Sequence, residues 1–138
     1  MFILYPQPNR QVAVVIPCGD INNAINDIPI GSEYKIVESL NIDDEYFEAY
    51  EFDLIEGAKI NITKAKEIHY NKFRFSRSSL LEKLDISFMR AVETGDINLQ
   101  KEIASQKQAL RDVTSIDLPD TLEEIKEVWP EILKPRLL

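Results

Sequence analysis

The sequence has few of the residues that build catalytic centres or covalent frameworks. It contains a single cysteine, Cys18, and a single histidine, His69. One thiol cannot form an internal disulfide, and these two residues do not supply the ligands of a zinc site. A histidine that serves as a catalytic base needs a nucleophile and an orienting group, and His69 has neither in a recognisable sequence context. We therefore predict no catalytic residue and expect that the chain is not an enzyme.

Glycine and the sequence patterns of ligand-binding loops are also scarce. The four glycines stand singly, and none belongs to a loop that cradles phosphate groups, so no nucleotide cofactor is expected. The acidic stretch Asp43-Asp44-Glu45 with Glu48 lacks the alternating oxygen ligands and the central glycine of a calcium loop. We predict a solvated acidic turn there. Neither a metal nor a cofactor is predicted.

Long apolar runs and an excess of positive charge are absent as well. No stretch approaches the roughly 20 apolar residues of a membrane span, and Met1 to Tyr5, followed by Pro6, is too short for a signal peptide. A net charge of −8 argues against general binding to nucleic acid. The 138 residues, 44% of them hydrophobic, predict one core with an appendage in the cytoplasm, without membrane or nucleic-acid partners.

The charges are distributed unevenly along the chain. Between Asp20 and Glu56 there are eleven acidic residues and one basic residue, Lys35. From Gly57 to Arg77 the sign reverses, with six basic residues and one acidic residue. This pattern is typical of a solvated surface with internal ion pairs, and it is also compatible with a charged patch that steers a partner.

Residues 1–62 are predicted to form a small β-rich region with a mostly antiparallel sheet between residues 10 and 62. The best strand is Gln11 to Ile16, which is β-branched and stopped by Pro17. Turn-forming residues fill Cys18 to Asn26, and a helical turn is expected between Asn41 and Phe47. Three further strands are predicted at Tyr34–Val37, Tyr50–Leu54 and Ala58–Ile62, the last two pairing across a turn.

Residues 63–138 are predicted to form a helical hairpin with a short C-terminal helix, which makes the fold class α+β. Thr63 to Glu93 contains neither glycine nor proline, so it predicts one helix of about 46 Å, with a kink allowed near Ser76. Thr94-Gly95-Asp96 reverses the chain into a second helix, Ile97 to Arg111. In the hairpin core, Leu84 and Phe88 of the first helix are expected to pack against Leu99, Ile103 or Leu110 of the second.

The C-terminal helix is marked by a capping box, Thr121 with Glu124, and is expected to end near Trp129-Pro130. Trp129 is the only tryptophan in the chain. Its position favours a role as the anchor of this tail on the hairpin, and a place in a binding surface is the alternative.

The two arms of the hairpin differ in length, which predicts an uncovered surface on the longer one. A second helix of about 22 Å covers less than half of the first. Aromatic and basic residues are combined between Tyr70 and Arg77, a composition suited to a transient protein interface. The candidate partner-binding residues are Tyr70, Phe73, Arg74, Phe75, Arg77, Leu80, Leu81 and Trp129.

Several stretches resemble a family of small proteins from tailed-phage genomes, the phage tail assembly chaperones. The segments that carry the resemblance are KAKEIHYNKFR, LLEKLDISFMRAVETGD, IASQKQALRDV and TLEEIKEVWPEIL, between Lys64 and Leu133. The earlier stretches VAVVIP and DIPIGSEYKIV also resemble segments that precede this hairpin in longer phage members. None of these stretches is a catalytic signature, and their order carries the resemblance.

The resemblance implies a phage or prophage protein, encoded among tail genes, that helps a tail or tail-fibre polypeptide reach its assembled form in the host cytoplasm. An amphipathic helical surface suits this task because it can cover an exposed apolar segment until the client assembles. Two alternatives stay open. The protein is a minor structural component of the tail or tail tip in the virion, or its acidic first half makes it an inhibitor that mimics nucleic acid.

Overall fold

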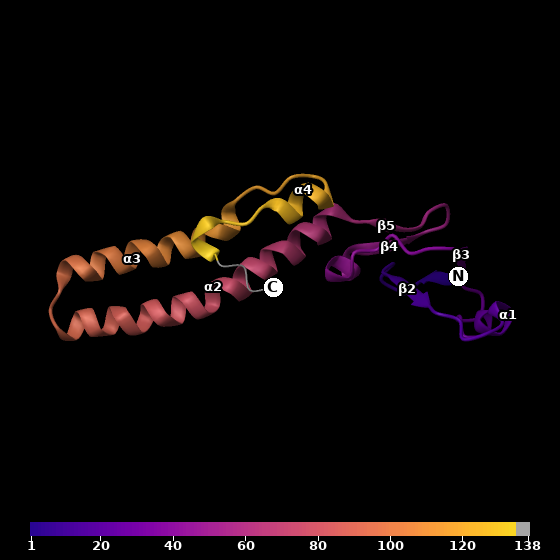
Figure 1. Ribbon diagram of the computed structural model, residues 1–138, viewed down its shortest axis with the longest axis horizontal. Coiled ribbons are helices and arrows are strands. Elements are labelled where there is room, and N and C mark those ends of the chain that lie inside the picture. Colours follow the sequence, from indigo (N-terminus) through magenta and orange to yellow (C-terminus); the bar gives the residue numbers. More distant parts are fainter. Residues whose placement is uncertain (135–138) are drawn as a thin grey trace. The chain divides into compact units, whose positions relative to one another are not determined.

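The computed structural model describes residues 1–134 and has the predicted α+β fold (Figure 1). The chain divides into two compact units, Met1–Ala65 and Lys66–Leu138. The predicted boundary between residues 62 and 63 lies three residues earlier, at the start of the long helix α2. Among residues 1–134 there is no helix with the length and apolar content needed to cross a membrane.

The first unit contains five short strands in two antiparallel sheets. Strand β1 (Phe2–Pro6) lies at the centre of a three-stranded sheet, between β2 (Val12–Val15) and β3 (Lys35–Val37). Strands β4 (Tyr50–Asp53) and β5 (Gly57–Ile60) form a two-stranded hairpin. A single bridge between Gln11 and Glu51 connects the two sheets.

Neighbouring residues of β1 point to opposite faces of the larger sheet, and both faces are covered. Ile3 packs with Ala24 and Ile28 on one face, where the short helix α1 (Ile21–Ile25) lies. Leu4, the next residue, is also buried and reaches towards Gly57 on β5. Because successive side chains of a strand point to opposite faces, β1 buries apolar residues on both sides. The 3-10 helix η1 (Asp44–Ala49) adds the fully buried ring of Tyr46.

Gly57 allows this close approach of β5 to the larger sheet. Its φ of +88° lies in the left-handed region, where a side chain is strained. A Cβ atom at this position would also lie 2.7 Å from Cδ1 of Leu4 and 3.1 Å from Cγ1 of Val37. Glycine is therefore required here for both its backbone conformation and its small size.

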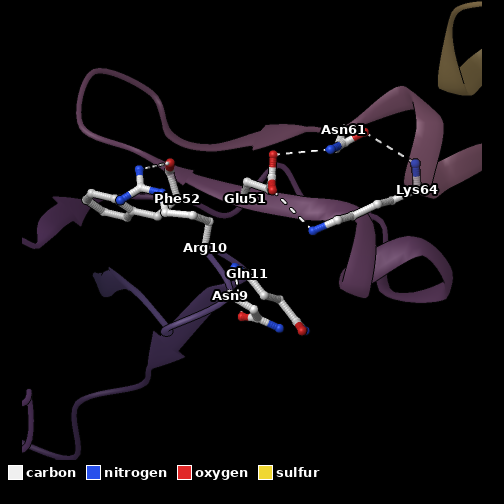
Figure 2. Close-up of polar contacts among 7 residues, drawn as sticks. All are labelled: Asn9, Arg10, Gln11, Glu51, Phe52, Asn61 and Lys64. Atoms are coloured by element: carbon white, nitrogen blue, oxygen red, sulfur yellow. Dashed lines mark hydrogen bonds and ion pairs between the residues drawn. The ribbon is translucent and has the colours of Figure 1, made fainter.

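A polar network joins the β1–β2 turn, strand β4 and the start of α2 (Figure 2). The guanidinium of Arg10 donates to the Phe52 carbonyl and lies 6.0 Å from the Phe52 ring. On the other side of β4, the Glu51 carboxylate accepts from Lys64 at 3.1 Å and from Asn61 at 3.3 Å. The hydrogen bond from Lys64 holds the pKa of Glu51 below its ordinary value, although partial burial opposes this shift.

The predicted strands of the first unit are confirmed, with bounds that differ by one or two residues, but they belong to two sheets and not to the single sheet predicted. The predicted helical turn is the 3-10 helix η1. The prediction missed β1 and α1. Met1 to Tyr5 is too short for a signal peptide, and no strand is predicted there, yet Phe2–Pro6 forms the central strand of the larger sheet. The predicted turn between Cys18 and Asn26 contains α1, which begins where the Asp20 carboxylate accepts from the Asn22 amide.

The second unit is built on a helical hairpin. Helix α2 (Ile62–Glu93) runs without a break through the serine-rich stretch where a kink was allowed. Asn61 caps it by accepting from the Lys64 amide, so the helix begins one residue before the predicted start at Thr63. Gly95 has a φ of +70°, and the Asp96 carboxylate accepts from the Leu99 amide to start α3 (Ile97–Arg111). The predicted chain reversal and the bounds of α3 are confirmed.

Three side-chain contacts define the antiparallel register of α2 and α3. Gln100 donates to the Ala91 carbonyl near the turn, and Lys107 pairs with Asp85 further along. Arg77 reaches the end of α3 and donates to the carbonyl of Arg111 at 3.1 Å. The chain continues through the 3-10 helix η2 (Asp112–Ser115), helix α4 (Leu122–Glu127) and the 3-10 helix η3 (Glu131–Leu133). Thr121 caps α4 as predicted, by accepting from the Glu124 amide.

We expect Gly57→Ala to destabilise the first unit more than Gly31→Ala does. Both positions have a positive φ, +88° and +81°, but a Cβ at Gly31 meets nothing within 4 Å. The left-handed conformation costs about 1–2 kcal/mol in either variant, and only Gly57→Ala adds the collision with Leu4. Thermal unfolding monitored by circular dichroism measures the difference. Equal melting temperatures for the two variants would contradict the close approach of β5.

Candidate partner-binding groove on the helical hairpin

A cluster of rings holds the C-terminal segment against the first half of α2. The His69 side chain is fully buried, and its Nε2 donates to the Val128 carbonyl at 2.7 Å. Phe73, one turn further along α2, is also fully buried. The Trp129 ring meets Phe73 edge to face, with the ring centres 5.3 Å apart, and His69 at 6.2 Å. The chain's only histidine thus packs in an aromatic core, as a hydrogen-bond donor.

Polar contacts fix the connection between α3 and α4 to the same helix. The Tyr70 hydroxyl donates to the Ile116 carbonyl, and Lys66 pairs with Asp120 at 2.8 Å. The hydrogen bond that Lys66 donates to Asp120, together with the charge of Lys66, holds the pKa of Asp120 below its ordinary value. Val113, Leu118, Ile125 and Leu133 supply buried apolar side chains to this region. Residues 112–133 therefore form a second layer on α2.

A groove opens on the hairpin beside η3. Its volume is about 310 Å³, and its walls come from α2, α3 and η3. Leu80 and Leu84 lie one turn apart on α2 and are half-buried. The lining residues are Leu80, Lys83, Leu84, Gln106, Leu110 and Ile132. Four of these six are aliphatic, and the remaining two offer one ammonium group and one amide, which suits the binding of an apolar chain segment.

Several predicted partner-binding residues face the interior of the second unit. Phe73 was expected to face outwards, and this prediction is wrong because its ring packs fully buried against His69 and Trp129. Tyr70, Arg77 and Trp129 are half-buried and bond to main-chain carbonyls of Ile116, Arg111 and Leu133, respectively. For Trp129 the structure confirms the anchoring role. These four residues position the groove walls and do not line them.

The other predicted residues lie at the surface, and only Leu80 is in the groove. Arg74 is held by Glu67 at 2.7 Å and Asn71 at 2.6 Å along the exposed side of α2. Phe75 is 69% exposed and lines a separate hollow of about 350 Å³ with Ser78 and Glu82. Leu81 is half-buried outside the groove lining. The structure therefore does not bring the eight predicted residues together in one site.

Sequence reasoning missed most of the groove. Leu84 and Leu110 were assigned to the hairpin core, where they were expected to meet, and they do line the same space. Leu110 is buried, but Leu84 is only half-buried, because no side chain of residues 1–134 fills the groove above it. Leu99 is 40% exposed, which does not fit its predicted core position. The sequence does contain a usable signal for the place of Ile132 in the groove, since it is an apolar residue just beyond the anchoring Trp129.

Within residues 1–134, no three histidine, cysteine, aspartate or glutamate side chains are grouped as a metal ion would require. Cys18 is exposed in the first unit.

Comparisons with protein-family models, with curated proteins and with solved structures gave no match.

We expect His69→Ala to destabilise the second unit by about 2–4 kcal/mol. The substitution leaves a cavity between Phe73 and Trp129 and removes the donor of the Val128 carbonyl. Thermal unfolding followed by fluorescence of Trp129 reports directly on this contact, because the chain has no other tryptophan. Ser78→Ala, at an exposed position of the same helix, serves as the control. Equal melting temperatures for the two variants would show that the ring cluster does not hold the tail.

Proposed function

We propose that this protein assists the assembly of a phage tail or tail fibre by binding an apolar segment of an immature tail polypeptide. The observation that supports this function best is the open aliphatic groove formed by α2, α3 and η3. The resemblance of residues 64–133 to phage tail assembly chaperones supplies the biological setting. No catalytic residue is assigned, and binding alone accounts for the activity.

The groove is suited to reversible binding. Its walls rest on a folded layer, so the protein does not have to unfold or rearrange to present them. Its volume of about 310 Å³ accommodates a few aliphatic side chains. A permanent interface buries many more side chains than that. A client segment bound in this way is protected from aggregation and can still leave when its own assembly surface becomes available.

A minor structural role in the virion is a second candidate, and the turn of the hairpin favours it. Four large apolar residues near this turn are more than half exposed, namely Ile86, Met89, Val92 and Ile97. Permanent incorporation into a tail would bury them. Detection of the protein in purified virions, at a constant ratio to a tail protein, distinguishes this role from that of an assembly factor.

Co-expression tests the proposed function. We expect the protein to raise the soluble yield of the tail or tail-fibre protein encoded beside it, and Ile132→Glu to abolish most of this effect, because a carboxylate in the groove opposes apolar contact. Ile132 is 40% exposed, so the variant should still fold, which circular dichroism verifies. Val92→Glu, near the turn, and Phe75→Glu, on the surface predicted from sequence, are matched controls that should retain the effect.

The proposal fails if the wild-type protein leaves the client's solubility unchanged, or if Ile132→Glu supports it fully. Loss of the effect in Val92→Glu alone would move the binding surface to the turn of the hairpin. Loss in Phe75→Glu alone would move it to the exposed side of α2.

A further inference from the structure

Among residues 1–134, Lys83 is the only charged residue that lines the groove. It forms no ion pair within residues 1–134, whereas several other cations of the second unit do. Examples are the pairs Lys66–Asp120, Arg74–Glu67, Lys107–Asp85 and Lys134–Glu131. Its position follows Leu80 by three residues and precedes Leu84, so all three belong to one side of α2.

An uncompensated ammonium at an aliphatic groove affects which segment binds there. A wholly apolar segment would remove water from around the Lys83 ammonium and offer it no acceptor, which opposes binding. A segment with a carboxylate next to its apolar side chains restores an acceptor and adds electrostatic attraction. The aliphatic stem of Lys83 contacts apolar surface in either case, so the charge alone discriminates between the two segments.

A second copy of this chain is a poor occupant of the groove. Two copies joined by a two-fold axis would use the same patch on both partners. Each copy would then bring its own Lys83 into one small aliphatic interface. Like charges in such a site destabilise the contact.

We propose that the groove selects an apolar segment that carries a carboxylate, and that Lys83 is the residue that recognises this carboxylate. This inference rests on the proposed function and specifies the chemistry of the client: aliphatic side chains at one face of the segment, with aspartate, glutamate or a C-terminal carboxylate beside them. Leu80, Leu84, Leu110 and Ile132 provide the contact area, and Lys83 provides the selectivity.

Binding of two designed peptides to the purified protein tests the inference. Both are fluorescently labelled helices of about 14 residues with leucines at helical spacing, and their polar positions are glutamate in one peptide and lysine in the other. Fluorescence anisotropy gives the affinity of each. We expect wild-type protein to prefer the glutamate peptide, and Lys83→Glu to weaken its binding by roughly three- to tenfold at low ionic strength. Lys83→Met, which keeps the apolar stem, should show a smaller loss.

Lys101→Glu is the matched control, because it changes the net charge equally at an exposed position of α3 outside the groove. It should retain the preference of the wild type. The difference between the two variants should shrink as salt rises towards 1 M, where charges are screened within about 3 Å. Equal effects of Lys83→Glu and Lys101→Glu, or equal affinity of wild-type protein for both peptides, would overturn the inference.

The same variants separate this inference from the proposed function. If wild-type protein raises the client's soluble yield and Lys83→Glu does so equally well, the function stands and the carboxylate selectivity is wrong. If sedimentation shows a dimer that Ile132→Glu dissociates, the groove binds a second copy and the inference is also wrong.

Discussion

The packing of Trp129 on His69 and Phe73 is the interaction on which the second unit depends. Helix α2 has 32 residues, and α3, with 15, is too short to cover it. Residues 112–133 provide the missing layer, because the rings and the His69–Val128 hydrogen bond hold their C-terminal part on α2. Without this contact the apolar side of α2 would lose its cover, and Ile132 would lose the support that places it at the groove.

The groove follows from the way in which this layer meets the hairpin. Leu80 and Leu84 lie on α2 beside η3, where α3 contributes only Gln106 and Leu110 to the lining. The distance between the walls leaves about 310 Å³ unfilled. Cores are normally packed without such space, so an open aliphatic groove on a well-supported scaffold is a candidate for binding rather than a consequence of poor packing.

The sequence predicted the elements well, but it did not predict how they pack. Gly95 and Asp96 mark the chain reversal and Thr121 marks the start of α4, because turns and caps depend on local residue chemistry. Strand β1 was missed because its apolar run lies at the terminus and resembles a short leader segment. Residues 73 and 75 are both phenylalanines and lie two positions apart in the sequence, yet only Phe73 is buried. Which of them faces inwards depends on residues 112–133, which lie at least 37 positions further along the chain, and the local pattern does not contain that information.

Hydrogen exchange measured on the purified protein, alone and with the proposed tail client, tests the central claim most directly. The account predicts that the client increases the protection of α2 around Leu80 and Leu84, of α3 around Gln106 and Leu110, and of η3, because these segments line the groove. The first unit and the turn of the hairpin should exchange as in the free protein. New protection confined to the first unit or to the turn, with the groove segments unchanged, would contradict the account.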